Sequence, residues 1–428
     1  MPALCTATEK FHLPTVSSTA IESTPFAQPP TEHPAAAPAP GRCLRPGRRA
    51  GGLPVIMYLL MMLTAAIVSY AATWGARLIG NRLELYSPIR SRDTHSHQVS
   101  RLGGMGIFAG FLVALIVASQ SFFVKDIFRG NDSPWGVLAG AALIVLVGLA
   151  DDLLDLRWWV KLIGQSAAAG VVALWGVRMT IVPFIPEPIV IENEAVSVVL
   201  TAGLIVTTMN AFNFIDGLDG LAAGVAIIGG TAFFLTAYWV HRTAVLMDRS
   251  DLATLLTAIL VGSCLGFLPH NWFPSKIFMG DSGAMLIGLL MASAGIVSTG
   301  QITSGLYDRI NGIPTIIPIL LPFAVLFLPL LDLGLAVVRR TARRRSPWSA
   351  DRGHLHHKLL DIGYSHRTAV VLMYLWTCVL AFGGLAFVVF PWQIVLTVDL
   401  VATVAMAVVT ALPYIRQRTP RRAARTPE

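Results

Sequence analysis

PVIMYLLMMLTAAIVSYAATWGA, residues 54–76, is an apolar stretch long enough for one helix to cross a hydrocarbon core of roughly 30 Å. Similar stretches recur along the rest of the chain. We place them near residues 102–120, 135–150, 162–180, 196–212, 222–240, 252–269, 284–300, 314–338, 370–390 and 394–414. The sequence therefore predicts an all-α polytopic membrane protein with about eleven transmembrane helices.

The composition supports the same fold class. Hydrophobic residues make up 54% of the 428 residues and charged residues 13%, whereas soluble domains contain about 25% charged residues. The net charge of +8 could indicate nucleic acid, but in a membrane protein it is typical of basic loops that face the cytoplasm and anionic lipid. We therefore expect the lipid bilayer, and no nucleic acid, as a partner.

The 32 Lys and Arg residues also predict the topology. Most of them lie in the loops after the odd-numbered spans and in the tail after the last span, which the positive-inside rule places in the cytoplasm. The N-terminus is then outside and the C-terminus cytoplasmic. Residues 1–53, rich in Pro and Ala, predict a disordered tail. Residues 54–414 form the membrane domain, and residues 415–428 a basic cytoplasmic tail.

Two segments depart from plain apolar helices. Residues 181–193, IVPFIPEPIVIEN, are rich in β-branched residues and punctuated by Pro, which favours a small external hairpin. The ninth span contains Pro314, Pro318, Pro322 and Pro329, and we expect these prolines to kink or break the helix.

The first polar cluster directly follows the third span. In LADDLLDLRWWVK, residues 149–161, Asp151 and Asp152 are adjacent and Lys161 lies ten positions after Asp151. Neighbouring carboxylates at a membrane edge are costly unless a cation lies between them. The cluster therefore indicates a bound cation, and a simple cap at the membrane edge is the alternative.

The second cluster is NAFNFIDGLDGLAAG, residues 210–224. Asn210, Asn213, Asp216 and Asp219 recur every three residues, so a helix end would present them on neighbouring faces. Their amides and carboxylates could hold a nucleotide base or ribose, or contribute to a metal site. A helix C-cap would explain a glycine here, but not four polar side chains.

The third cluster is FMGDSG, residues 278–283, where Asp281 stands before the eighth span. A helix N-terminus with flanking glycines suits phosphate, and a carboxylate suits Mg²⁺. An ordinary Asp N-cap is the alternative.

The fourth cluster lies in the basic loop at residues 339–367, which contains Arg352, His354, His356 and His357. Three histidines could indicate zinc, but no cysteine is near, and the carboxylates of the other clusters suit Mg²⁺ better. Arg352 and Lys358 are suited to donate to phosphate oxygens.

All four clusters fall on the predicted cytoplasmic face. Carboxylates, oxygen ligands for a metal and a cationic loop together indicate Mg²⁺-dependent phosphoryl transfer at the membrane surface. A membrane transporter is the alternative class, and it would place acidic residues near the middle of the bilayer and contain internal repeats. We find the carboxylates at span ends and no clear repeat.

These motifs resemble those of the polyprenyl-phosphate N-acetylhexosamine-1-phosphate transferase superfamily. The resemblance covers about residues 58–413 and includes RLGG at 101–104, HLHH at 354–357 and Asp332. It implies transfer of a sugar 1-phosphate from a UDP-sugar to a polyprenyl phosphate with release of UMP. It also implies Mg²⁺, with Mn²⁺ as a substitute, a bacterial cell membrane, and a homodimer.

Two branches of the superfamily are alternatives. The branch that transfers phospho-MurNAc-pentapeptide carries three adjacent histidines, whereas Leu355 interrupts the run here. The loop resembles that of the GlcNAc-1-phosphate transferases, which implies UDP-GlcNAc as donor and undecaprenyl or decaprenyl phosphate as acceptor.

The resemblance also implies roles. Asp281 binds Mg²⁺; Asp151 and Asp152 position or deprotonate the prenyl phosphate, which Lys161 could contact. Residues assigned to the nucleotide sugar are Asn210, Asn213, Asp216, Asp219, Arg352, His354, His356 and His357.

Overall fold

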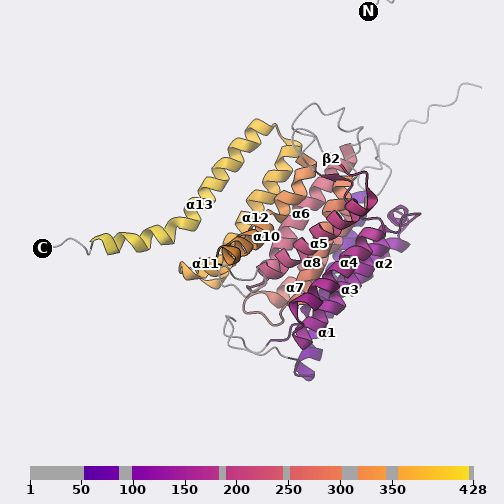
Figure 1. Cartoon of the computed structure of the whole chain (residues 1–428), viewed down its shortest axis with the longest axis horizontal. Coiled ribbons are helices and arrows are strands. Elements are labelled where there is room, and N and C mark those ends of the chain that lie inside the picture. The colour runs from indigo at the N-terminus through magenta and orange to yellow at the C-terminus, as the bar shows by residue number, and fades with distance from the viewer. Residues whose placement is uncertain are drawn as a thin grey trace, which may run out of the picture. The chain divides into compact units, whose positions relative to one another are not determined.

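The computed structural model describes residues 53–85, 99–182, 189–243, 251–300, 317–343 and 355–423. Its elements are α1 (Leu53–Arg82), α2 (Gly103–Gln120), η1 (Lys125–Ile127), α3 (Ser133–Leu154), α4 (Trp158–Leu174), β1 (Ile181–Val182), β2 (Ile189–Val190), α5 (Glu194–Ile215), α6 (Leu221–Thr243), α7 (Leu252–Asn271), α8 (Gly280–Gly300), α10 (Ile317–Ala342), α11 (Leu355–Asp361), α12 (His366–Val389) and α13 (Trp392–Ala423) (Figure 1). The predicted tail at residues 1–53 lies outside this part except for Leu53.

The helices confirm a polytopic all-α membrane protein. Within the described ranges, nine helices are long and apolar enough to cross a membrane, namely α1, α2, α3, α5, α6, α7, α8, α12 and α13. The predicted fourth span corresponds to α4, an apolar helix of 17 residues, and the ninth to α10, of 26 residues. The total of about eleven spans and the orientation of the termini stay predictions.

Helices α7 and α8 form the centre of the bundle. In their most apolar windows 83% and 89% of the residues are buried within the protein, against 6% in α13. Helix α8 contacts α2, α3, α5, α6, α7 and α10, whereas α13 packs on α12 and leans away from the other helices in Figure 1. The side chains of α13 are therefore largely left to lipid.

Small residues allow α7 to lie directly against α1. A Cβ atom at Gly262 would collide with the Met62 carbonyl, and one at Gly266 with the Ala66 carbonyl. Close backbone approach at two glycines four positions apart is how membrane helices gain packing energy without a hydrophobic driving force between them.

The hairpin prediction is confirmed. β1 and β2 pair antiparallel, with Ile181 opposite Val190 and Val182 opposite Ile189. The expected break of the ninth span does not occur between Ile317 and Ala342, where α10 is continuous. Pro318 lies in its first turn, where no intrahelical hydrogen bond is lost. Pro314 lies outside the described residues.

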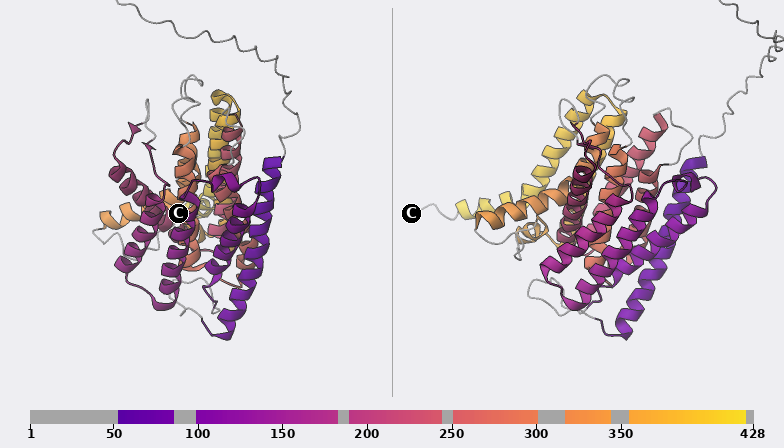
Figure 2. Two further views of the ribbon diagram at one scale, coloured as in Figure 1. Left: turned by 90° about the vertical axis from the view of Figure 1, so that its right-hand side faces the viewer. Right: turned by 45° about the vertical axis from the view of Figure 1, so that its right-hand side comes forward.

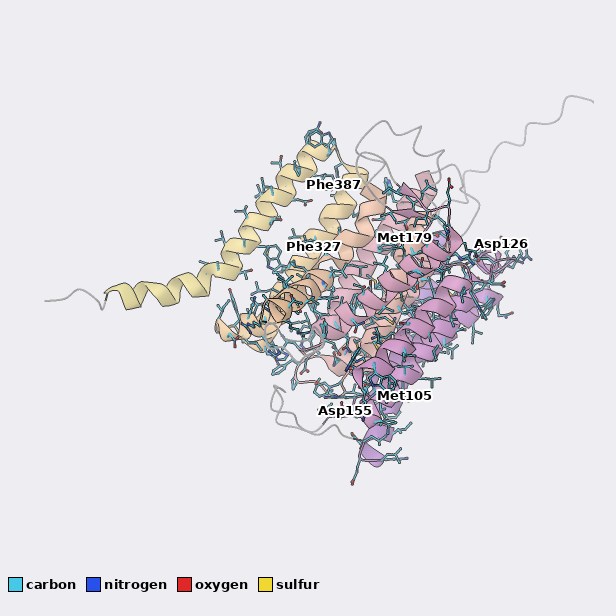
Figure 3. The ribbon with its side chains drawn as sticks, in the orientation of Figure 1. Met105, Asp126, Asp155, Met179, Phe327 and Phe387 are labelled. Atoms are coloured by element: carbon cyan, nitrogen blue, oxygen red, sulfur yellow. The ribbon has the colours of Figure 1, made fainter. Side chains whose placement is uncertain are left out.

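The polar clusters gather at one end of the bundle. Helices α3 and α5 end there, and the turns from α5 to α6 and from α7 to α8 lie there, while η1 and the hairpin lie at the other end (Figure 2). Figure 3 labels Asp155 at the first end and Asp126 and Met179 toward the second. We call the first the site end.

The α1–α7 contact gives a stability prediction. We expect Gly266→Ala to lower stability by roughly 1–3 kcal/mol, because a new methyl group meets rigid backbone. The measurement is the Tm of the purified protein in detergent. Gly203→Ala is the control, since nothing lies within 4 Å of its added Cβ; an equal Tm change in both variants would contradict the packing argument.

Candidate active site

The segment at residues 100–104 is hydrogen-bonded through its backbone to the segment before α8. Phe278 N–H donates to the Ser100 carbonyl at 2.9 Å, and Gly103 and Gly104 N–H donate to the carbonyls of Phe278 and Met279 at 3.0 and 2.8 Å. A Cβ atom at Gly104 would collide with Gly283. The two glycines of RLGG thus let FMGDSG lie against the start of α2.

Asp152 holds the first turn of α8. Its carboxylate accepts the Asp281 N–H at 3.1 Å, the Ser282 N–H at 3.3 Å and the Ser282 hydroxyl at 3.2 Å. A carboxylate at a helix N-terminus is favoured by the unpaired N–H groups and by the helix dipole. Gly280 enters this turn with φ of +73°, a conformation that glycine adopts without strain.

This contact corrects one expectation from the sequence. The start of α8 was expected to suit phosphate, but its N–H groups at Asp281 and Ser282 already donate to Asp152. An internal carboxylate occupies the place of the anion, so the geometry does not favour phosphate at this helix end.

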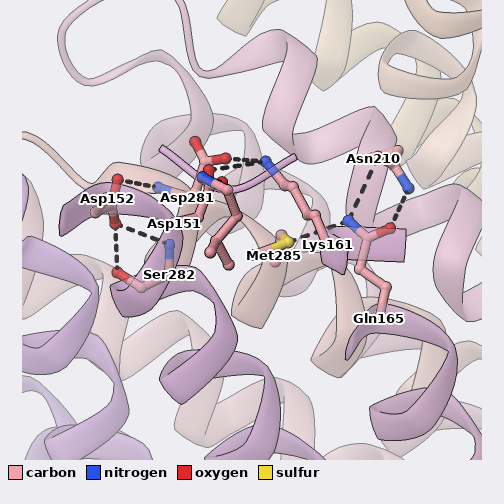
Figure 4. Close-up of polar contacts among 9 residues, drawn as sticks. Asp151, Asp152, Lys161, Gln165, Asn210, Asp281, Ser282 and Met285 are labelled. Atoms are coloured by element: carbon pink, nitrogen blue, oxygen red, sulfur yellow. Dashed lines mark hydrogen bonds and ion pairs between the residues drawn. The ribbon is translucent and has the colours of Figure 1, made fainter. Parts of the chain in front are cut away.

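Asp151, Lys161 and Asp281 form the charged centre of the site (Figure 4). Lys161 Nζ lies 3.4 Å from Asp151 Oδ2 and also forms an ion pair with Asp281 Oδ2. Asp151 Oδ1 accepts the Leu156 N–H at 3.1 Å, which fixes the carboxylate after α3 ends. The three side chains come from α3, α4 and α8, so two carboxylates from different helices face one cation.

The polar run at 210–219 is divided between a helix and a turn. Helix α5 ends at Ile215, and Asp216 follows as a partly buried cap residue. Burial, followed by the negative charges of Asp152 and Asp219, raises the pKa of Asp216 to about 7, while the Arg101 guanidinium opposes the rise. The site end is therefore short of positive charge near Asp216.

Asp219 is buried in the turn from α5 to α6. Its Oδ2 accepts the Ser275 N–H at 3.0 Å, and its own N–H donates to His366 Nε2 at 3.1 Å. The next residue, Gly220, donates to Asn271 Oδ1 at 2.9 Å. The buried carboxylate links the α5–α6 turn to the α7–α8 turn, and its predicted contact with the nucleotide stays a prediction.

Asn210 is paired with Gln165 in the interior. Asn210 Nδ2 donates to Gln165 Oε1 at 2.8 Å and to the Val206 carbonyl at 2.8 Å, and Gln165 Nε2 returns a bond at 3.4 Å (Figure 4). The amide pair joins α4 to α5. Asn213 lies one turn further toward the site end and is only partly buried. Its side chain is therefore accessible for the predicted contact with the nucleotide.

The histidine cluster lies partly outside the described residues, since Arg352 and His354 precede α11. His356 and His357 lie in the first turn of α11, and His357 is partly buried. The buried Asp332 on α10 accepts the Leu355 N–H at 2.9 Å. Asp332 thus fixes the point at which the histidine helix begins, which accounts for an acidic residue late in the ninth span.

The expected Mg²⁺ can be compared with these donors. In the described ranges no group of three or more His, Cys, Asp or Glu side chains is arranged to hold a metal ion. Mg²⁺ in phosphoryl-transfer sites is commonly held by one or two carboxylates together with substrate phosphates and water. Asp151 and Asp281, which share one cation, fit that requirement.

Sequence patterns did not reveal several residues that build the site. Gln165 is a lone amide in an apolar helix, Asn271 is the last residue of α7, and Ser275 lies in the segment between α7 and α8 without a recognisable motif. Their signal is weak because the contacts that place them at the site join segments far apart in the sequence. Arg101 was visible only as part of RLGG.

A family model and individual relatives both match this chain. Residues 134–299 match the model of glycosyl transferase family 4. The chain is 39% identical over 375 residues to the decaprenyl-phosphate N-acetylglucosaminephosphotransferase of Mycobacterium leprae, covering 86% of this chain and 94% of the relative. It is 30% identical to the probable undecaprenyl-phosphate N-acetylglucosaminyl 1-phosphate transferase of Bacillus subtilis, covering 75% and 81%.

The capping contact of Asp152 gives a second prediction. We expect Asp152→Ala to lower stability by about 1–2 kcal/mol, because two helix N–H groups and a buried hydroxyl lose their acceptor. Thermal unfolding in detergent measures it, with Asp126→Ala at the other end as the control. An unchanged Tm for Asp152→Ala would show that the carboxylate does not hold α8.

Proposed function

The chain belongs to glycosyl transferase family 4, in the branch of polyprenyl-phosphate N-acetylglucosamine-1-phosphate transferases, and we propose that it uses UDP-GlcNAc and a divalent cation held at Asp281. It transfers GlcNAc-1-phosphate to a polyprenyl phosphate. Relatives that are 39% identical to this chain are named for decaprenyl phosphate, which supports a long polyprenyl acceptor. Their names also favour GlcNAc over the phospho-MurNAc-pentapeptide alternative.

One observation carries the proposal for the cation. The carboxylates of Asp151 and Asp281 approach the same positive charge although they come from separate helices. Two carboxylates held this close repel each other unless a cation lies between them. When bound there, Mg²⁺ would screen the diphosphate and neutralise the leaving group.

The reaction follows from the two substrates. A phosphate oxygen of the lipid attacks the sugar-linked phosphorus of UDP-GlcNAc, and the bond from that phosphorus to the UMP oxygen breaks. Polyprenyl-pyrophosphoryl-GlcNAc and UMP are the products. A phosphate monoester has a second pKa of about 6, so most of the nucleophile is ionised near neutral pH, and Asp151 serves to position it more than to remove a proton.

The remaining residues divide the work of binding. Asp152 keeps the first turn of α8, and therefore Asp281, in place. Asn213 and Asp216 lie at the end of α5, and the charge of Asp152 acts on Asp216; we assign both residues to the nucleotide. Arg352, His354, His356 and His357 belong to the loop before and in α11, and we assign them to the diphosphate.

We also propose the bacterial cell membrane as the location, with the site end in the cytoplasm. The excess of Lys and Arg in the predicted loops of that end supports this orientation. The homodimer implied by the family resemblance stays a prediction.

The reaction and its metal are tested together. We expect the purified protein to release UMP from UDP-GlcNAc when polyprenyl phosphate and Mg²⁺ are present, and Asp281→Asn to reduce that rate on the order of 100-fold or more. Asp126→Asn, at the opposite end, is the matched control. Full activity of Asp281→Asn would contradict the metal assignment, and turnover with UDP-MurNAc-pentapeptide alone would contradict the donor.

The orientation has a separate test. In a background without native cysteines, Val190→Cys in the hairpin should react with a membrane-impermeant maleimide in intact cells. Leu154→Cys at the site end should react only after the cells are permeabilised. Both side chains are exposed in the structure, so access across the membrane decides the difference. The reverse pattern of labelling would contradict a cytoplasmic site.

A further inference from the structure

The charged centre already contains a cation of its own. Lys161 projects from the first turn of α4 and contacts Asp151 Oδ2 at 3.4 Å, and it is ion-paired with Asp281 Oδ2. The exposed fractions of the three side chains are 17%, 14% and 26%. Water therefore screens these charges only in part, and the pairing is stronger than at an open surface.

The Lys161 ammonium group partly compensates an excess of negative charge. Asp151, Asp152 and Asp155 all act on Lys161 electrostatically, and Asp281 at the start of α8 is ion-paired with it. The N–H groups of the first turn of α8 donate to the Asp152 carboxylate. Asp151 lies in the last turn of α3, and Asp281 lies in the first turn of α8, where these N–H groups already donate to Asp152. Lys161 is the cation that the carboxylates of Asp151 and Asp281 both contact.

We propose that Lys161 is a tethered counter-ion that competes with the divalent cation for Asp281. This rests on the proposed function, in which Asp281 is the metal ligand. Asp281 Oδ2 cannot be bound closely by an ammonium group and a divalent ion at once, because the two positive charges would repel at contact distance. Loading of the metal therefore requires Nζ to leave Asp281, while Asp151 keeps it nearby.

Two consequences follow. Lys161 weakens metal binding, since the ion must displace a charge-assisted hydrogen bond. It also stabilises the metal-free protein, because removing one partner of a buried ion pair leaves an uncompensated charge. A residue with a merely structural role would lower stability with and without metal, and would not strengthen metal binding.

The experiment uses the full chain in detergent with Mn²⁺ as the probe, and electron paramagnetic resonance to count free Mn²⁺. Lys161→Met keeps the length of the side chain and removes its charge. We expect its Kd for Mn²⁺ to fall roughly tenfold, its Tm in EDTA to fall, and its Tm gain on adding Mn²⁺ to exceed that of the unaltered protein.

Two controls accompany this variant. Lys161→Arg keeps the charge and should bind Mn²⁺ as the unaltered protein does. Lys125→Met removes a lysine that lies over the Phe122 ring at the other end, and it should leave the Kd unchanged. If Lys161→Met does not fold, Lys161→Gln takes its place, because its amide can donate to a carboxylate without carrying charge.

The outcomes separate the inference from the function on which it rests. An unchanged or weaker affinity of Lys161→Met, with Mn²⁺ binding still lost in Asp281→Asn, would overturn the competition alone. Binding that survives in Asp281→Asn would overturn the metal site and the inference with it. Tighter binding in Lys161→Met that disappears in the double variant with Asp281→Asn would support both.

Discussion

The carboxylate of Asp152 at the start of α8 is the contact on which the rest of the site depends. It accepts the N–H groups of Asp281 and Ser282, so it fixes the backbone of the first turn and with it the position of the Asp281 side chain. At a membrane edge a carboxylate needs a compensating positive charge, and a helix end supplies one without a side chain. Asp151 lies in the last turn of α3, and the N–H groups beside Asp281 already donate to Asp152. Both carboxylates therefore contact Lys161 instead, and in our proposal the metal takes its place at Asp281.

Glycine makes the same arrangement sterically possible. At Gly148 a Cβ atom would collide with the backbone of Ser282, and at Gly280 with Asp152 and the Arg101 carbonyl. Helices α3 and α8 therefore touch along their backbones where the acidic residues emerge. Glycines in RLGG and FMGDSG have the same effect, because they remove side chains from the line along which three segments meet. The glycines of both motifs are therefore needed for packing, and the polar residues for chemistry.

The sequence predicted the membrane fold and the four clusters because both depend on local pattern. Apolar length identifies a span wherever it occurs, and a polar residue in an apolar context is conspicuous by itself. Partner choice was not predictable: nothing near Asn210 indicates that Gln165, 45 positions away, accepts its amide. Nor could the sequence show that Asp152 accepts the N–H groups at the start of α8, where the pattern favoured phosphate. Pro318 falls in the first turn of α10 only because the helix begins at Ile317, and that starting point is not visible in the pattern.

A motif residue therefore need not touch a substrate. The polar groups of the four clusters fall into two kinds. Asp152, Asp219, Asp332 and Asn210 accept or donate hydrogen bonds that tie one helix or turn to another, and changing them should disturb the shape of the site before its chemistry. Asp151 and Asp281 are both paired with Lys161, and Asp216 has its pKa raised by burial and like charge. The polar groups of the first kind have hydrogen-bond partners within the protein, which offset the free-energy cost of burying them. The second kind brings negative charges together, and Lys161 is paired with two of them. In our proposal the metal and the substrate add positive charge at these groups, and interactions that strengthen in the transition state are the ones that speed the reaction.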